Sequence, residues 1–215
     1  LMGDFLFARA GEYVADTQTP RVIKLFSHTL ATISSGEIGQ FRGSYNLKQD
    51  REAYFRRIYR KTASLFSLST QSGAILCDAT EEQIAIMKEY ADNLGIAFQI
   101  TDDLLDIVGD PSVTGKDLGA DLIGGKYTLP VLTAMRDPQV GEQCRSILIS
   151  RNGDLTPKDA GEVARLVREC GAAETARQTA LEHSQRACDQ LDSLPPSDYT
   201  RALRSLAASV VDREG

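Results

Sequence analysis

Apolar residues recur at every third or fourth position along most of the chain, which is the spacing of amphipathic helices. The segment near residues 80–108 shows this pattern most clearly. Its apolar positions are Ile84, Met87, Ala91, Leu94, Phe98 and Leu105. Strand-like alternation between turns is missing from the sequence, and glycine and proline cluster in a few places only. The pattern therefore predicts an all-α fold.

Capping residues indicate where the helices begin and end. Thr80 followed by Gln83 matches a capping box, Pro157 after Thr156 suits a first helical turn, and Gly171 suits a helix end. We expect helices at roughly 4–15, 20–42, 49–77, 80–108, 127–136, 138–151, 157–170, 172–193 and 197–213. The sequence has no internal repeat, so these helices should form one domain over residues 1–215.

The composition is that of an ordinary globular protein. The chain has 215 residues, of which 42% are hydrophobic, so it can bury a sizeable core. Its net charge is −6 and no basic stripe stands out, which argues against a nucleic-acid partner. No apolar run reaches the ~18 residues of a transmembrane segment.

The cysteines and the first residues bear on the cellular compartment. Four scattered cysteines without a CxxC pair predict reduced, buried thiols in a cytoplasmic protein. Cys77 follows Ile75 and Leu76, so we expect it to pack in the core. The opening segment LMGDFLFARAGEYV lacks the features of a signal peptide and reads as the middle of a helix.

An acidic cluster lies at the C-terminal end of the long helix predicted near 80–108. Asp102 and Asp106 are one turn apart on one face, with Asp103 beside them. Like charges at this spacing cost roughly 0.2–0.5 kcal/mol, and the helix dipole also disfavours anions at this end. Bound Mg²⁺ would relieve both effects, because it prefers carboxylate oxygens. A solvated acidic helix end is the other interpretation.

A glycine-rich segment with two lysines follows the acidic cluster. Lys116 and Lys126 suit phosphate oxygens, and the glycines allow a close approach of the backbone. The segment is not a Walker A loop, since Tyr127 follows Lys126 where that motif requires serine or threonine. An EF-hand is also excluded by the spacing of the aspartates. A flexible loop with solvated cations remains the alternative.

Three stretches of sequence together resemble the trans-polyprenyl diphosphate synthase family, which includes farnesyl, geranylgeranyl and longer-chain synthases. The string GIAFQITDDLLDIVGDPSVTGKDLGADLIGGKYTLP (95–130) is similar to the second aspartate-rich region of that family. YRKTASLFSLSTQSGAIL (59–76) resembles its helix with a Lys-Thr pair, and GDFLFARA (3–10) resembles one of its core helices. The resemblance implies an isoprenoid-synthase-type bundle of mostly antiparallel helices around a central cavity.

The resemblance also implies a chemistry and its residues. An allylic prenyl diphosphate would condense with isopentenyl diphosphate to give a trans-polyprenyl diphosphate, with Mg²⁺ as cofactor. Asp102 would coordinate Mg²⁺ directly, and Asp103 and Asp106 would complete the acidic shell. The residues implied to act on the substrate diphosphate and its reacting end are Lys61, Thr62, Gln99, Lys116 and Lys126. The family also pairs through central helices, which implies a homodimer.

The sequence departs from the family pattern in its first part. A first DDxxD followed by two arginines, and earlier basic residues that bind isopentenyl diphosphate, are not found. We therefore interpret the chain as an N-terminally incomplete synthase domain; the alternative is a non-catalytic partner subunit or an inactive fragment of the same fold. A terpene cyclase is disfavoured, because LEHSQRACDQLDSL (181–194) supplies no second metal motif.

The remaining polar residues have ordinary interpretations. His28 and His183 lack a second ligand at a suitable spacing, so we expect satisfied polar side chains rather than metal ligands. The basic cluster REAYFRRIYRK (51–61) predicts a solvated helix face. Alternatively, Arg56, Arg57 and Arg60 would face a diphosphate or an anionic membrane surface.

Overall fold

The computed structural model describes residues 1–109, 118–150 and 153–212, and this part of the chain contains helices and no strands. The elements are α1 (Met2–Asp16), α2 (Pro20–Arg42), α3 (Arg51–Ile58), the π-helix η1 (Tyr59–Ala63), α4 (Ser64–Leu76), α5 (Glu81–Val108), α7 (Ala120–Ile123), α8 (Leu129–Ala134), α9 (Gly141–Ser150), α10 (Pro157–Glu169), α11 (Ala172–Gln190), the 3-10 turn η2 (Leu191–Ser193) and α12 (Asp198–Val211). The predicted all-α fold is confirmed.

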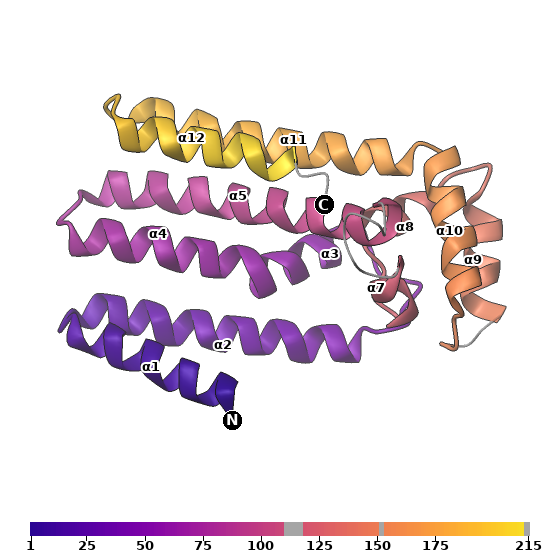
Figure 1. Cartoon of the computed structure of the whole chain (residues 1–215), viewed down its shortest axis with the longest axis horizontal. Helices are drawn as coiled ribbons and strands as arrows, with labels where there is room; N and C mark the ends of the chain where they lie inside the picture. The colour runs from indigo at the N-terminus through magenta and orange to yellow at the C-terminus, as the bar shows by residue number, and fades with distance from the viewer. Residues whose placement is uncertain (110–117, 151–152, 213–215) are drawn as a thin grey trace.

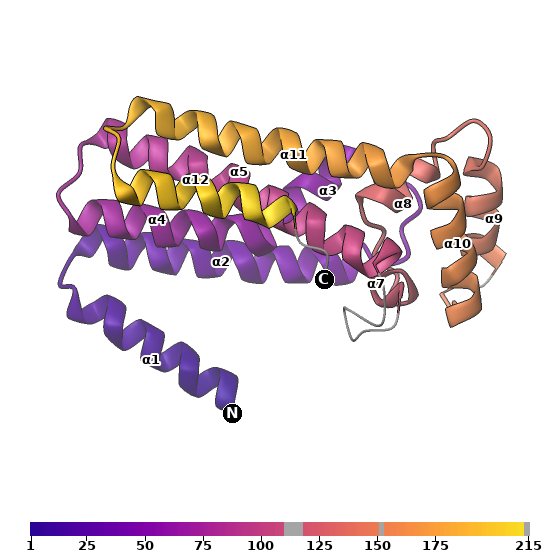
Figure 2. The ribbon, with the colours of Figure 1, turned by 45° about the horizontal axis from the view of Figure 1, so that its top comes forward.

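The long helices run side by side along the long axis of the molecule (Figure 1). α5 is central and packs most extensively against α4 on one side and α11 on the other. Successive long helices run in opposite directions, and the short helices α7 to α10 gather at one end (Figures 1 and 2). The C-terminal end of α5, which carries the acidic cluster, lies at that same end.

The core lies along α5, where side chains at helical spacing point inward. Leu94, Ala97 and Ile100 are at most 2% exposed and pack against residues of α3, α8 and α11. Tyr90 is also fully buried, and its hydroxyl donates a hydrogen bond to the carbonyl of Leu203 at 2.9 Å. Burial of this kind stabilises the bundle because apolar area leaves water and buried polar atoms keep partners.

Each predicted segment contains a helix, and the capping predictions hold. Thr80 and Gln83 form a reciprocal capping box at the start of α5, as Thr156 and Asp159 do at α10. Two features were not predicted. The expected helix 49–77 is continuous but contains the π-helix η1, and the one-turn helix α7 lies in the glycine-rich segment.

η1 is the point where three helices approach most closely. A Cβ added to Gly95 of α5 would lie 2.5 Å from the Cα of Ala63, and one added to Gly36 of α2 would lie 3.0 Å from the Cβ of Arg60. Glycine at both positions lets the two backbones reach η1. π-helical turns occur frequently at functional sites, and this one carries Lys61 and Thr62.

One expectation was wrong. Cys77 is exposed, because it is the C-cap residue of α4 at the end of the bundle, where no other element covers it; Cys144 is buried, and Cys170 and Cys188 are partly buried. α1, which resembles a core helix, has no buried residue and makes most of its contacts with α2. None of the described helices is both long and apolar enough to cross a membrane.

Candidate active site

A chain of hydrogen bonds joins η1, α5 and α3. The hydroxyl of Thr62 donates to Oε1 of Gln99 at 2.6 Å, and Nε2 of Gln99 donates to Oδ1 of Asp103 at 2.8 Å. The hydroxyl of Tyr54 donates to Oδ2 of Asp103 at 2.7 Å. Both ends of the Gln99 amide are therefore held, and its orientation is set by the two groups that it contacts.

Asp103 is the most unusual residue of the cluster, because it is only 3% exposed. Burial raises its pKa to about 7, against the opposing effect of hydrogen bonds from Tyr54 and Gln99 and of the charge on Arg57. Burial, together with the carboxylate of Asp103, also raises the pKa of Tyr54 well above its usual range, so Tyr54 remains a donor. The site thus holds a buried acid that is close to half-charged at neutral pH.

Asp106 lies one turn further along α5 and faces the segment that contains α7. Its Oδ2 accepts the backbone N–H of Asp121 at 3.2 Å. Burial, and then the charge of Asp121, raise the pKa of Asp106 to about 6. The turn before α7 depends on Gly119, which has φ of 75° and packs so tightly that an added Cβ would lie 2.8 Å from the Cβ of Ala160.

The lysines of the site are paired with carboxylates. Nζ of Lys61 lies 3.2 Å from Oε1 of Glu37 on α2, and Nζ of Lys126 lies 2.7 Å from Oδ1 of Asp121. Both lysine side chains are 35% exposed, so water and ligands can reach them. Arg57 donates to the carbonyl of Tyr127 at 3.0 Å and has no carboxylate partner within the described residues.

These groups surround a small pocket of about 30 Å³. This is roughly the volume that one water molecule occupies in the liquid. Its lining residues are Gln40, Arg57, Ile58, Lys61, Gln99, Asp103, Asp121, Lys126 and Thr128. A diphosphate fits only if the Lys61–Glu37 and Lys126–Asp121 pairs separate. Phosphate oxygens would then replace the two carboxylates as acceptors.

The structure brings together Lys61, Thr62, Gln99, Asp103 and Lys126 of the predicted site residues. Asp102 is exposed and does not line this pocket, and Asp106 contacts its edge through Asp121. Lys116 lies outside the described residues. Nε2 of Gln99 donates to Asp103, which lies four residues further along α5.

Sequence reasoning assigned no role to Tyr54 or Asp121, and it gave Arg57 a contact with a diphosphate or a membrane surface only as the alternative to a solvated helix face. Asp121 ends the stretch GKDLGAD (115–121), which lies inside the string that resembles the family, so its signal was present. Tyr54 lies four and eight residues before Ile58 and Thr62, which is the spacing of one helix face. Arg57 gave no such signal, because it belongs to a run of basic residues with no distinguishing spacing.

The cluster has the donor chemistry of a magnesium site, although its carboxylates are spread out. No three Asp, Glu, His or Cys side chains within the described ranges are grouped closely enough to hold one ion by themselves. Mg²⁺ is commonly held by one or two carboxylates, with water and substrate phosphates as the other ligands. Asp102 and Asp106 suit that mode, whereas both oxygens of Asp103 already accept hydrogen bonds.

The predicted histidine roles also agree with the structure. Nδ1 of His183 lies 2.8 Å from Oδ1 of Asn93, on the side of the bundle formed by α5 and α11. Its ring also packs against Phe55, with centroids 5.8 Å apart. His183 is therefore a satisfied polar residue, and His28 is exposed on α2.

Comparisons with known proteins point in one direction. The sequence model of the family described as "Polyprenyl synthetase" matches residues 1–168. The chain is 35% identical over 215 residues to an octaprenyl diphosphate synthase from Haemophilus influenzae, covering 99% of this chain and 64% of that protein. It is 32% identical to heptaprenyl diphosphate synthase component 2 from Geobacillus stearothermophilus, covering 99% and 65%.

A solved structure gives the same result for the fold. A polyprenyl synthase from Caulobacter crescentus, complexed with calcium and isoprenyl diphosphate, superposes with a TM-score of 0.91 at 31% identity. The match covers 99% of this chain and 65% of that one. The chain thus spans slightly less than two thirds of the length of these relatives.

Proposed function

Because the chain belongs to the polyprenyl synthetase family, we propose that its protein is a trans-prenyltransferase. It would condense an allylic prenyl diphosphate with isopentenyl diphosphate to give a trans-polyprenyl diphosphate. The observation that carries this proposal is the hydrogen-bond chain from Thr62 through Gln99 to Asp103, next to two lysines in one pocket. In this arrangement the lysines are suited to bind a diphosphate, and the hydrogen bonds orient the Gln99 amide dipole beside it.

The two lysines would bind the diphosphate of the allylic substrate. Lys61 and Lys126 both line the pocket, and each is paired with a carboxylate that a phosphate group can displace. Charge-assisted contacts of this kind strengthen as negative charge collects on the departing group. Lys116 is proposed, on the resemblance alone, to bind the same diphosphate.

Asp102 and Asp106 would hold Mg²⁺, with Asp103 completing the acidic shell. When bound, Mg²⁺ would neutralise the charge that develops on the leaving diphosphate. Asp103 has a second role, because its two oxygens fix Gln99 and Tyr54. The solved polyprenyl synthase from Caulobacter crescentus, complexed with calcium and isoprenyl diphosphate, supports a role for a divalent ion.

Thr62 and Gln99 would lie beside the reacting carbon. Once the C–O bond breaks, the allylic carbon alkylates isopentenyl diphosphate, and loss of a proton leaves a trans double bond. The hydroxyl oxygen of Thr62 and the amide oxygen of Gln99 are dipoles that favour the transient positive charge. Their mutual hydrogen bond keeps them in place and limits the reorganisation that the reaction requires.

A non-catalytic subunit of the same fold is the second candidate. The name of the Geobacillus relative, a synthase "component 2", supports an assembly of unlike chains.

We also propose a homodimer for the intact protein, because α1 carries exposed apolar side chains that include Phe5, Leu6 and Phe7. Light scattering at micromolar concentration would distinguish a monomer from a dimer. The cytoplasmic location stays a prediction.

Calorimetry tests the function directly. We expect an allylic diphosphate, or a bisphosphonate mimic, to bind the chain more tightly with Mg²⁺ than without it, and Asp102→Ala to weaken that binding. Equal affinities for the two proteins would refute the metal assignment. Turnover is measured separately with isopentenyl diphosphate: product would favour the synthase, whereas binding without product is expected of either a non-catalytic subunit or an inactive fragment.

A further inference from the structure

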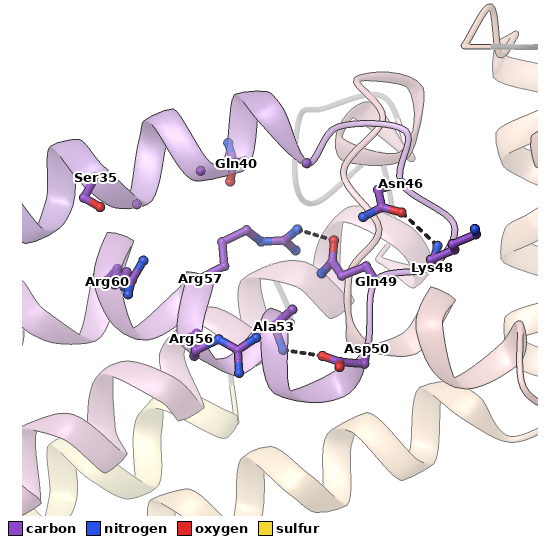
Figure 3. Close-up of a pocket in the computed structure, with 13 residues that line it drawn as sticks. Ser35, Gln40, Asn46, Lys48, Gln49, Asp50, Ala53, Arg56, Arg57 and Arg60 are labelled. Carbon is purple, nitrogen blue, oxygen red and sulfur yellow. Dashed lines mark hydrogen bonds between the residues drawn. The ribbon is translucent and has the colours of Figure 1, made fainter.

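A second and larger pocket of about 280 Å³ lies between the C-terminal half of α2 and α3 (Figure 3). It shares only Gln40 and Arg57 with the candidate active site. Three glycines line it and leave room along α2: Gly36 and Gly39 within the helix, and Gly43 as its C-cap residue. The space admits several water molecules or one phosphate-sized group.

The charge of this pocket is strongly positive. Its lining includes four cations: Lys48, Arg56, Arg57 and Arg60. The one carboxylate of the lining, Asp50, is already engaged as the N-cap of α3, where it accepts the backbone N–H of Ala53 at 2.6 Å. Lys48 and Arg60 have no carboxylate partner among the residues that the structure describes.

The pocket also holds a buried donor without an acceptor. Oε1 of Gln49 accepts from Arg57 at 3.1 Å, which fixes the direction of the amide (Figure 3). Nε2 of Gln49 is then buried and has no hydrogen-bond partner in the described structure. Nearly all buried donors in proteins have partners, so this one indicates an acceptor that the chain itself does not provide.

We propose that this pocket binds a phosphate- or diphosphate-type anion, at a site separate from that of Lys61 and Lys126. The groups that line it are mainly donors, and guanidinium groups match phosphate oxygens in pairs. The anion has two chemically equivalent sources, which are a free diphosphate and the headgroup of an anionic lipid. Either one would lie next to the candidate active site, on the other side of Arg57.

Two substitutions test the pocket at residues that do not themselves line the candidate active site. Gln49→Glu keeps an acceptor for Arg57 but replaces the unpartnered donor with a negative charge. Arg60→Gln removes one cation from an exposed side chain. Lys158→Gln, on the exposed face of α10, changes the net charge equally and is the control. Circular dichroism verifies that each variant folds.

Calorimetry with inorganic diphosphate in EDTA is the first arm, since chelation removes any binding that depends on a metal. We expect binding to the parent chain, weaker by about ten-fold or more in both pocket variants and unchanged in Lys158→Gln. The second arm is sedimentation with vesicles of phosphatidylglycerol and phosphatidylcholine. If only these vesicles bind, with the same loss in both pocket variants, the phosphate comes from lipid.

Two results would overturn the proposal. One is that neither ligand binds, or that binding is the same in Gln49→Glu, Arg60→Gln and the control. The other is that Lys126→Ala alone abolishes diphosphate binding, which would assign the anion to the candidate active site. Neither result depends on turnover or on Mg²⁺, so this proposal and the proposed function fail separately.

Discussion

Replacing Asp103 by asparagine should make stability less dependent on pH. Asparagine has the shape of the protonated acid and carries no charge, so the variant resembles the parent chain under acidic conditions. Tyr54 and Gln99 keep partners in the amide of the new side chain. What the substitution removes is the cost of ionising a carboxyl group that is 3% exposed.

The sign and size of the effect follow from the raised pKa. An unfolded aspartate has its pKa near 3.8, and that of folded Asp103 is about 7. Between these values the folded chain binds more protons than the unfolded chain, so stability falls as pH rises through this window. About three pKa units correspond to an upper limit of about 4 kcal/mol, fully present above pH 7.

Urea unfolding of both chains between pH 4 and pH 8, in EDTA, measures this difference. We expect the two free energies of unfolding to agree within about 1 kcal/mol at pH 4, and the variant to gain up to about 4 kcal/mol by pH 8. Asp102→Asn is the matched control, because it removes the same charge from an exposed side chain. A difference that stays constant over this range would refute the buried, half-charged state of Asp103.

Three further predictions concern packing, pH and the anion. Gly95→Ala should destabilise the fold by about 1–3 kcal/mol, because its methyl group would lie 2.5 Å from the backbone of η1. Gly73→Ala, which has open space around it, should instead stabilise the fold by about 0.5–1 kcal/mol, and urea midpoints measure both effects. Burial lowers the pKa of His183 to about 4, so stability should fall as pH drops from about 6.5 towards 4. His183→Gln should remove about 1–2 kcal/mol of that loss, after allowance for the partial exposure of the ring, and thermal melts at each pH measure the difference. Lys126→Ala should weaken binding of an allylic diphosphate with Mg²⁺ about ten- to a hundred-fold in calorimetry, whereas Lys158→Ala should have no effect, and equal affinities would show that Lys126 is an ordinary surface cation.

The sequence by itself predicted the longer helices, because each depends on local information. Apolar spacing identifies a helical face, and pairs such as Thr80 and Gln83 close a capping box within one turn. The conflict of Asp102 and Asp106 also drew attention to this end of α5, since neighbours on one face can be counted from the sequence. The resemblance to the family supplied Lys61, Thr62, Gln99 and Lys126 as candidates, and these lie close together.

Only the tertiary structure decided which charges are buried and which are paired. Asp102 and Asp103 are adjacent in sequence, but successive helical residues point in directions about 100° apart. Asp102 is therefore exposed, whereas Asp103 is buried and accepts a hydrogen bond from Tyr54. The partners of Lys61 and Lys126, and the exposure of Cys77, also depend on what other elements cover. A pKa follows from burial and neighbouring charges, which are set by contacts between segments far apart in sequence, and no local pattern contains them.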